Sequence, residues 1–281
     1  AARWVRGVKL SQGVANARRA QRTVLGPIQR LLTSAVLTGV IGLGVFIPTI
    51  TLCLWVMDGL RRSLPFVSPW IALSDTLLAA VVGAGLTVIL AWLPALAVTR
   101  RQQRGQASGW LEDTVYLTSA LPGVLLALGL MLATLTATKH LPQGSYGVIL
   151  GSGALLMIGY ATRFVAETFA PVRDAMSAID ERQLDSARVL GANAMRRFRT
   201  IILPSMAPGL AAAFVIAFNA IVKELPVTLL LGGATGLKTL SFRVWDRYSE
   251  SLWHDAGLAG LILVALALAS AVFTTRWRQH G

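Results

Sequence analysis

The sequence contains few cysteines, histidines and acidic residues. Its 281 residues include one cysteine, Cys53, three histidines and 13 aspartates and glutamates. A single cysteine excludes a disulfide within the chain, and no spacing among His140, His254 and His280 suits a metal site. The chain also lacks a glycine-rich phosphate-binding loop and a serine–histidine–aspartate order. We therefore expect no enzymatic activity, no metal site and no cofactor.

Charged residues are absent from six long stretches, and hydrophobic residues make up 54% of the chain. A transmembrane helix needs about 20 mostly apolar residues to cross roughly 30 Å of hydrocarbon. The stretches do not show the two-residue alternation of β-barrel strands. The sequence predicts an all-α polytopic membrane protein with six transmembrane helices, at 31–57, 76–99, 114–138, 140–162, 200–222 and 256–275.

The net charge of +13 could indicate a nucleic-acid partner, but the basic residues are unevenly distributed. If the N-terminus is cytoplasmic, the inner segments 1–30, 100–113, 163–199 and 276–281 carry 19 lysines and arginines, and the outer segments carry 6. This asymmetry follows the positive-inside rule. It predicts an inner-membrane protein with both termini in the cytoplasm, in contact with membrane lipid and not with nucleic acid.

Residues 1–30 carry seven basic residues and no apolar core, so they do not form a signal peptide. They could lie as a helix on the anionic inner leaflet. We favour a basic cytoplasmic linker over 1–30, cut from a longer polypeptide, followed by a six-helix transmembrane module over 31–281.

The longest predicted cytoplasmic loop, residues 170–208, is polar but patterned. Leu184, Ala187 and Val189-Leu190 share one helical face. Gly191 is expected to interrupt this helix with a positive φ at its C-terminal cap. A second short helix should follow at about 193–202 and end at Leu203-Pro204. The pattern favours a docking surface, whereas an amphipathic pair lying on the lipid is the alternative.

The spacing within this loop resembles the EAA loop of ATP-binding-cassette (ABC) importer permeases. That pattern is Glu-Ala-Ala, three residues, Gly, nine residues, Ile, one residue, Leu-Pro. Aspartate replaces the glutamate here, and serine replaces the first alanine. The resemblance implies the type I permease fold and a loop seated in cytoplasmic ATP-binding subunits, whose closure moves the helices. The matching residues are Asp185, Ser186, Ala187, Gly191, Ile201, Leu203 and Pro204.

A second signature lies in the last half of the predicted fifth helix, where Asn219, Lys223 and Glu224 are expected to line a translocation path. A charge at membrane depth costs about 3 kcal/mol and favours a functional role. An inter-helix ion pair is the alternative role for the two charges. Residues 223–231 closely resemble the Lys-Glu-Leu-Pro-Ala-Thr-Leu-Leu-Leu run of ferric-iron ABC permeases, and similarity extends over about 70–275.

The resemblance implies a transport component for ferric iron, with sulfate, thiamine and polyamine permeases as relatives. It also implies a periplasmic substrate-binding protein and a second transmembrane module, in the same or a separate chain. Because many ferric-iron permeases join two modules, the absence of an initial methionine and the basic start suggest the second module. An ion channel, which needs no coupling loop, is the rival from another class.

Overall fold

The part of the chain that the structure describes consists mostly of helices. The computed structural model describes residues 26–142, 144–179 and 181–280. These residues form α-helices joined by short 3₁₀ and π turns, and they contain no strand. Five helices are long and apolar enough to cross a membrane, and one bent pair raises the number to six. The predicted all-α transmembrane fold is confirmed, and its sixth span is this bent pair.

The chain divides into two compact units, residues 1–48 and 49–281. In the first unit, α1 (Pro27–Ile41) buries no side chain and leads into the π turn η2 (Gly42–Phe46). Helix α2 (Ile47–Arg61) follows without a break and continues into the second unit. The π turn ends two residues before Pro48, which has no amide hydrogen to donate.

The predicted linker at 1–30 lies mostly outside the described residues. Only residues 26–30 of it are described, and α1 begins among them at Pro27, after the N-cap Gly26. The first span is therefore longer at both ends than the predicted 31–57, because the apolar run ends before the helix does.

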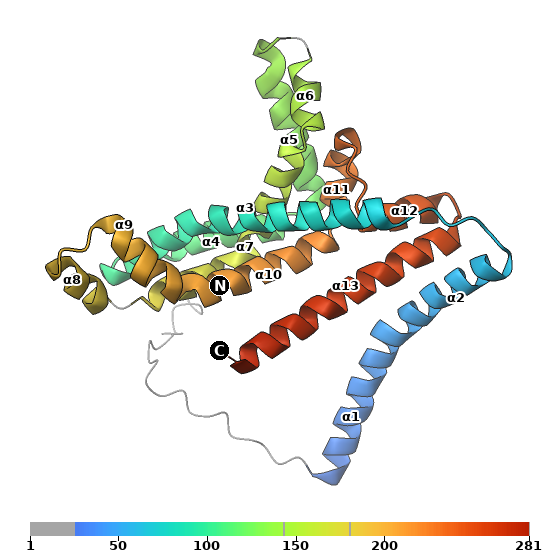
Figure 1. Ribbon diagram of the computed structural model, residues 1–281, viewed down its shortest axis with the longest axis horizontal. Helices are drawn as coiled ribbons and strands as arrows, with labels where there is room; N and C mark the ends of the chain where they lie inside the picture. Colours follow the sequence, from blue (N-terminus) through green and yellow to red (C-terminus); the bar gives the residue numbers. More distant parts are fainter. Residues whose placement is uncertain (1–25, 143, 180, 281) are drawn as a thin grey trace, which may run out of the picture. The chain divides into compact units, whose positions relative to one another are not determined.

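Three long helices form the centre of the second unit (Figure 1). They are α3 (Trp70–Gln103), α7 (Ala154–Ser177) and α10 (Leu203–Val222), and each packs against the other two. Helix α4 (Gly109–Ala120) packs mainly on α7 and also touches α3. This helical centre positions both regions that the sequence analysis selected.

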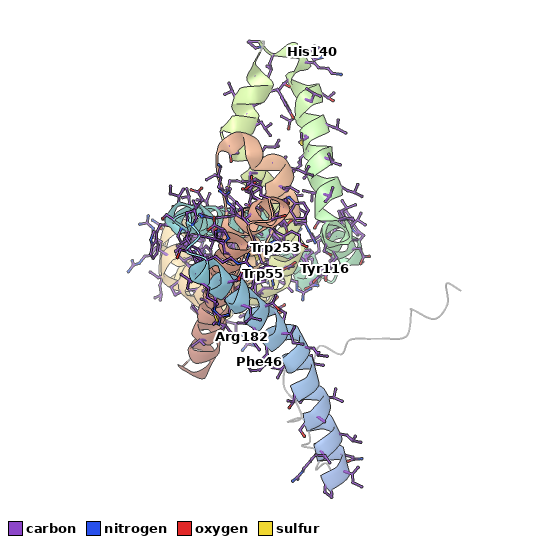
Figure 2. The ribbon with its side chains drawn as sticks, turned by 90° about the vertical axis from the view of Figure 1, so that its right-hand side faces the viewer. Phe46, Trp55, Tyr116, His140, Arg182 and Trp253 are labelled. Carbon is purple, nitrogen blue, oxygen red and sulfur yellow. The ribbon has the colours of Figure 1, made fainter. Side chains whose placement is uncertain are left out.

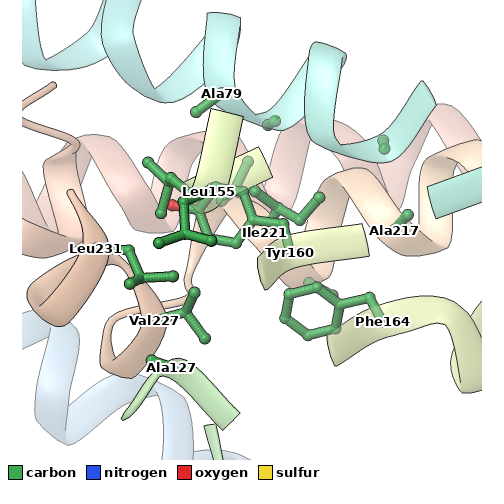
Figure 3. Close-up of a cluster of buried hydrophobic side chains, with 14 residues drawn as sticks. Ala79, Ala127, Leu155, Tyr160, Phe164, Ala217, Ile221, Val227 and Leu231 are labelled. Atoms are coloured by element: carbon green, nitrogen blue, oxygen red, sulfur yellow. The ribbon is translucent and has the colours of Figure 1, made fainter. Parts of the chain in front are cut away.

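Small residues allow these helices to approach closely. A Cβ added to Gly83 would lie 2.9 Å from the Ile221 side chain, and one on Gly209 would lie 2.5 Å from the Ala175 Cβ. In lipid, helices associate through such close packing because the surrounding chains are equally apolar. Figure 3 shows the resulting buried cluster, in which Ala79, Tyr160 and Ile221 come together from α3, α7 and α10.

The helix predicted at 114–138 is broken into α4 and α5 (Gly123–Ala137). Leu121 and Pro122 between them have extended backbone, with ψ angles of 128° and 137°. Pro122 has no amide hydrogen and disfavours the helical conformation at the residue before it. Hydropathy alone could not detect this break because the apolar run continues across it.

The span predicted at 140–162 consists of α6 (Ser145–Gly151) and α7, which meet at an angle of 60°. The bend lies at Ser152 and Gly153, and Gly153 has a φ of 75°. The connection from α5 passes through the 3₁₀ turn η3 (Thr138–His140). Helix α7 then continues to Ser177, well beyond the predicted end, because its buried apolar face continues beyond the first charged residue.

The predicted coupling loop contains α8 (Glu181–Val189), α9 (Ala194–Arg197) and the π turn η4 (Phe198–Ile202). The prediction that Leu203-Pro204 ends the second loop helix is wrong, since one continuous helix runs from Ala194 to Val222. The Leu203 amide donates to the Phe198 carbonyl, five residues back. A π turn at this point keeps the helix intact at Pro204.

The remaining elements are α11 (Pro226–Leu231), the 3₁₀ turn η5 (Gly233–Thr235), α12 (Leu240–Ser249) and α13 (Trp253–His280). Helix α12 packs on α13, and α13 contains the predicted span 256–275. Asp75 on α3 accepts the Lys238 amide at 2.9 Å, which fixes the start of α12 against α3.

Candidate functional site: a docking loop and a pair of helix breaks

The predicted coupling loop is held in shape at Gly191. This residue has a φ of 79°, so the predicted positive φ is confirmed. The Ala192 amide donates to the Ala187 carbonyl at 2.9 Å, and the Gly191 amide donates to the Arg188 carbonyl at 2.9 Å. These two bonds form a Schellman motif, which requires a left-handed residue after the helix. Helix α8 therefore ends at a defined point, and the chain turns toward α9.

The polar side chains of the motif make local interactions in the part of the chain that the structure describes. Asp185 pairs with Arg188 at 2.8 Å, and both side chains are about two-thirds exposed. The Ser186 hydroxyl donates to the Arg182 carbonyl at 2.9 Å. An exposed ion pair contributes little stability. The Asp185 carboxylate is thus accessible to a partner from outside the chain.

Apolar side chains of the loop are exposed to an unusual degree. Val189 is 88% exposed and Leu190 is 84% exposed. An apolar groove of about 400 Å³ lies between α8 and the helix that begins at α9, and its lining includes Leu184, Met195 and Phe198. A surface of this kind marks contact with another protein or with lipid.

The last three residues of the motif lie on the continuous helix that leads into α10. Ile201 is half-buried, whereas Leu203 and Pro204 are exposed. The structure therefore groups them with the membrane-entering helix, and groups Asp185, Ser186 and Ala187 with α8.

The second region contains two helix breaks that meet. Lys223, Glu224 and Leu225 separate α10 from α11, so the two charges do not lie inside a helix as predicted. A Cβ added to Gly123, directly after the α4–α5 break, would lie 3.1 Å from Glu224 Oε1. Non-helical backbone at membrane depth persists only where it is buried in protein or lines an aqueous cavity.

Side chains form hydrogen bonds with backbone amide and carbonyl groups at the Glu224 break. Glu224 Oε1 accepts the Val227 amide at 3.1 Å. The Glu224 carbonyl accepts the Thr228 hydroxyl at 2.8 Å and the Ser241 hydroxyl at 2.9 Å. The Tyr160 hydroxyl on α7 lies 2.6 Å from the Thr228 hydroxyl. This network links α7, α11 and α12 and holds the half-buried Glu224 carboxylate beside the start of α5.

The structure separates the three residues that were predicted to line the path. Lys223 is exposed, and within the described residues neither Lys223 nor Glu224 has an ion-pair partner within 4.0 Å. Asn219 donates to the Val215 carbonyl at 3.0 Å and accepts the Ser270 hydroxyl, which joins α10 to α13. Only Glu224 lies at the meeting of the two breaks.

Sequence reasoning did not identify Arg163 and Glu167. Both lie on α7 within electrostatic range of the Glu224 carboxylate. The Arg163 guanidinium lies 5.7 Å from the centre of the Phe164 ring, and its Nε is buried with no hydrogen-bond partner among the described residues. They were missed because the predicted span ended at residue 162. The apolar face that continues through Phe164 and Phe169 could have revealed the longer helix.

No group of three or more histidine, cysteine, aspartate or glutamate side chains gathers as a metal site in the described part of the chain. Glu224, Glu167 and Arg163 instead provide charges beside a helix break. Such charges can attract, orient or repel an ion.

Comparison with known proteins agrees with this architecture. Residues 88–280 match the family model described as "Binding-protein-dependent transport system inner membrane component". Two solved structures are similar in fold. One is a bacterial ABC transporter involved in import of the acidic polysaccharide alginate, with a TM-score of 0.60, 18% identity and coverage of 89% of this chain and 96% of that chain. The other is an amino acid ABC transporter, with a TM-score of 0.52, 14% identity and coverage of 80% and 98%.

Curated relatives are also transport permeases. The chain is 29% identical over 238 residues to the Fe(3+)-transport system permease protein FbpB 2 of Haemophilus influenzae, covering 84% of this chain and 45% of the relative. It is 29% identical over 219 residues to the thiamine permease ThiP of Escherichia coli, covering 75% and 39%. It is 28% identical over 194 residues to the molybdenum permease ModB of Azotobacter vinelandii, covering 63% and 82%.

The chain thus spans less than half the length of the iron and thiamine permeases. The family model covers more than half of this chain, and the membrane-spanning helices fit its description. The chain belongs to the binding-protein-dependent inner-membrane components of ABC importers.

Proposed function

We propose that this chain is a membrane module through which ferric iron enters the cell, driven by ATP hydrolysis on separate subunits. The observation that carries the proposal is the run from Lys223 to Leu231. It resembles the ferric-iron permeases in sequence, and its Glu224 lies where two helix breaks meet. The similarity to an Fe(3+) permease over 84% of this chain supports the same cargo. A carboxylate at this position suits a cation better than the molybdate anion.

The proposed partners are two cytoplasmic ATP-binding subunits, a periplasmic substrate-binding protein and a second transmembrane module. Helix α1 is apolar and buries none of its side chains, so it is available to lipid or to a second module. The family description, which names transport that depends on a binding protein, supports the periplasmic partner.

The continuous helix from Ala194 to Val222 supports a direct coupling mechanism. It carries the α9 side of the exposed groove at one end and leads to Glu224 at the other. At 1.5 Å per residue, 29 residues span roughly 43 Å. Closure of the ATP-binding subunits around α8 and α9 would move this helix as a rigid body. That motion would change the positions of the two helix breaks that meet at Glu224.

The identity of the transported substrate is tested by reconstituting the chain in vesicles with the binding protein and the ATP-binding subunits. We expect ferric iron loaded on the binding protein to stimulate ATP hydrolysis and to accumulate inside vesicles. Molybdate, thiamine and spermidine, each presented to the same assembly, should do neither. Transport of one of these in place of iron would overturn the assigned cargo and leave the permease assignment intact.

Topology is tested with single cysteines in a Cys53→Ser background. Gln103→Cys and Arg196→Cys should react with a membrane-impermeant thiol reagent only when the reagent has access to the cytoplasmic face of the membrane. Ser249→Cys should react from outside in intact cells. All three native side chains are exposed in the structure, so burial within the chain would not prevent labelling. Labelling of Arg196→Cys from the periplasm would refute the orientation and the docking role of the loop.

A further inference from the structure

A pocket of about 710 Å³ lies far in sequence from both the docking loop and Glu224. It is bounded by the end of α2, the segment that follows it, and the turn between α12 and α13. Its lining includes Trp55 and Asp58 from α2, Arg62 directly after α2, and Trp253 and Asp255 from α13. The volume falls within the range of sites that hold small molecules. Its walls combine aromatic rings with charges of both signs.

The aromatic wall suits a cation. The rings of Trp55 and Trp253 lie 5.1 Å apart at an interplanar angle of 58°, and Figure 2 shows the two residues close together. Tyr248 supports Trp253 edge-on at 4.8 Å. Tryptophan faces attract ammonium groups, most strongly where water is excluded. Asp255 lies buried behind this wall, 2% exposed, where it accepts the Val67 amide at 3.1 Å and lies 3.8 Å from Arg247 Nε. The accessible carboxylate of the pocket is therefore that of Asp58.

The charged edge of the pocket pairs a carboxylate with a guanidinium. Arg62 Nε lies 3.0 Å from Asp58 Oδ1, one helical turn away. The side chains are 68% and 55% exposed, so their mutual attraction is weak and can be exchanged for contacts with a ligand. Adjacent positive and negative groups complement a zwitterion, whose ammonium would approach Asp58 and whose phosphate would approach Arg62.

The position of the pocket indicates the source of such a zwitterion. One apolar span, Pro27–Arg61, ends at the pocket, and another, Trp253–Ser270, begins there. The ends of spanning helices lie at the level of lipid headgroups, where tryptophan is enriched. Exposed Leu54 and Met57 on α2 offer an apolar surface along which acyl chains can lie.

We propose that this pocket binds the headgroup of a zwitterionic, primary-amine phospholipid of the phosphatidylethanolamine type. The ammonium lies between the tryptophan rings and the exposed carboxylate of Asp58. The phosphate lies against Arg62, and the acyl chains follow α2 into the bilayer. The site is independent of cargo, and it ties the outer ends of the first and last spans to the membrane surface.

The test uses the full chain purified in nanodiscs that contain a photoreactive phosphatidylethanolamine, with labelled peptides mapped by mass spectrometry. We expect labelling to concentrate in residues 52–67 and 251–257. Unlabelled phosphatidylethanolamine should compete, and phosphatidylglycerol should not. The Asp58→Asn/Arg62→Gln double variant should lower labelling about fivefold, since two partly exposed charge contacts are removed. Lys139→Gln, which removes an exposed charge elsewhere, should leave it unchanged.

Leu64→Trp provides a second variant, because a larger side chain at this pocket-lining residue fills the space without removing a charge. It should reduce labelling as well. Even labelling along every span, or equal competition by phosphatidylglycerol, would overturn the proposal in favour of general lipid contact. Equal competition by glycerophosphoethanolamine, which lacks acyl chains, would overturn the lipid as occupant and indicate a soluble ligand.

Discussion

Replacement of Glu224 by glutamine is expected to lower iron uptake by about tenfold, a change of about 1.4 kcal/mol, because the helix break beside Gly123 loses its negative charge. Glutamine keeps the shape of the side chain and an oxygen that can accept the Val227 amide. No ion pair within 4.0 Å is lost among the described residues. The thermal unfolding midpoint should therefore change little while transport falls. Uptake into vesicles and thermal unfolding of the same preparation measure the two effects.

Asp113→Asn is the matched control, because it removes an exposed carboxylate from the first half of α4, away from the break that follows Ala120. It should transport like the unchanged protein. A different result is expected if the negative charge of the Glu224 carboxylate compensates the positive charge of the Arg163 guanidinium. Glu224→Gln would then destabilise the protein, and a further Arg163→Gln change would restore its stability. Normal uptake by Glu224→Gln would exclude Glu224 from the path.

Gly191→Leu should uncouple the module from its ATP-binding subunits. A residue with a side chain pays about 1–2 kcal/mol in the left-handed region, and leucine favours extension of α8 past its present end. A Cβ at Gly191 would meet nothing within 4 Å, so the effect comes from the backbone and not from crowding. We expect about a fivefold loss of stimulated ATP hydrolysis for a cost of roughly 1 kcal/mol. Membrane insertion should be unchanged.

Two variants separate this effect from general strain. Gly105→Leu places the same side chain at another open glycine, with a φ of 67°, in the segment between α3 and α4. It should leave coupling intact. Gly191→Asn should retain most activity, because asparagine tolerates the left-handed conformation. Unaltered coupling in Gly191→Leu would contradict the docking role of the loop.

The sequence predicted the transmembrane class well because each apolar run must be covered by lipid or protein. It also predicted the positive φ at Gly191, since glycine adopts that conformation without steric cost. The sequence-based prediction was wrong where a charged residue or a proline obscured the continuing hydrophobic pattern of a helix. Arg163 suggested the end of a span, but α7 continues because the buried face through Phe169 and Val172 continues.

Proline was ambiguous for a similar reason. Pro204 was expected to end a helix, yet the π turn before it keeps the helix continuous. Pro122 was expected inside a helix, yet the chain is extended there. Both prolines lack an amide hydrogen. The contacts of the neighbouring residues therefore decide whether a broken or a continuous helix has the lower free energy.

The sequence by itself determined that the chain crosses a membrane and that it resembles an ABC importer permease, and it predicted functional roles for Glu224 and the 185–204 motif. Composition and spacing carry this information because hydrophobic length and turn chemistry are local properties. Only the tertiary structure decided that Glu224 meets the α4–α5 break, that Lys223 is exposed, and that Arg163 and Glu167 lie within electrostatic range of Glu224. These facts depend on which helices pack together, and contacts between distant segments leave no periodic signal in a single sequence.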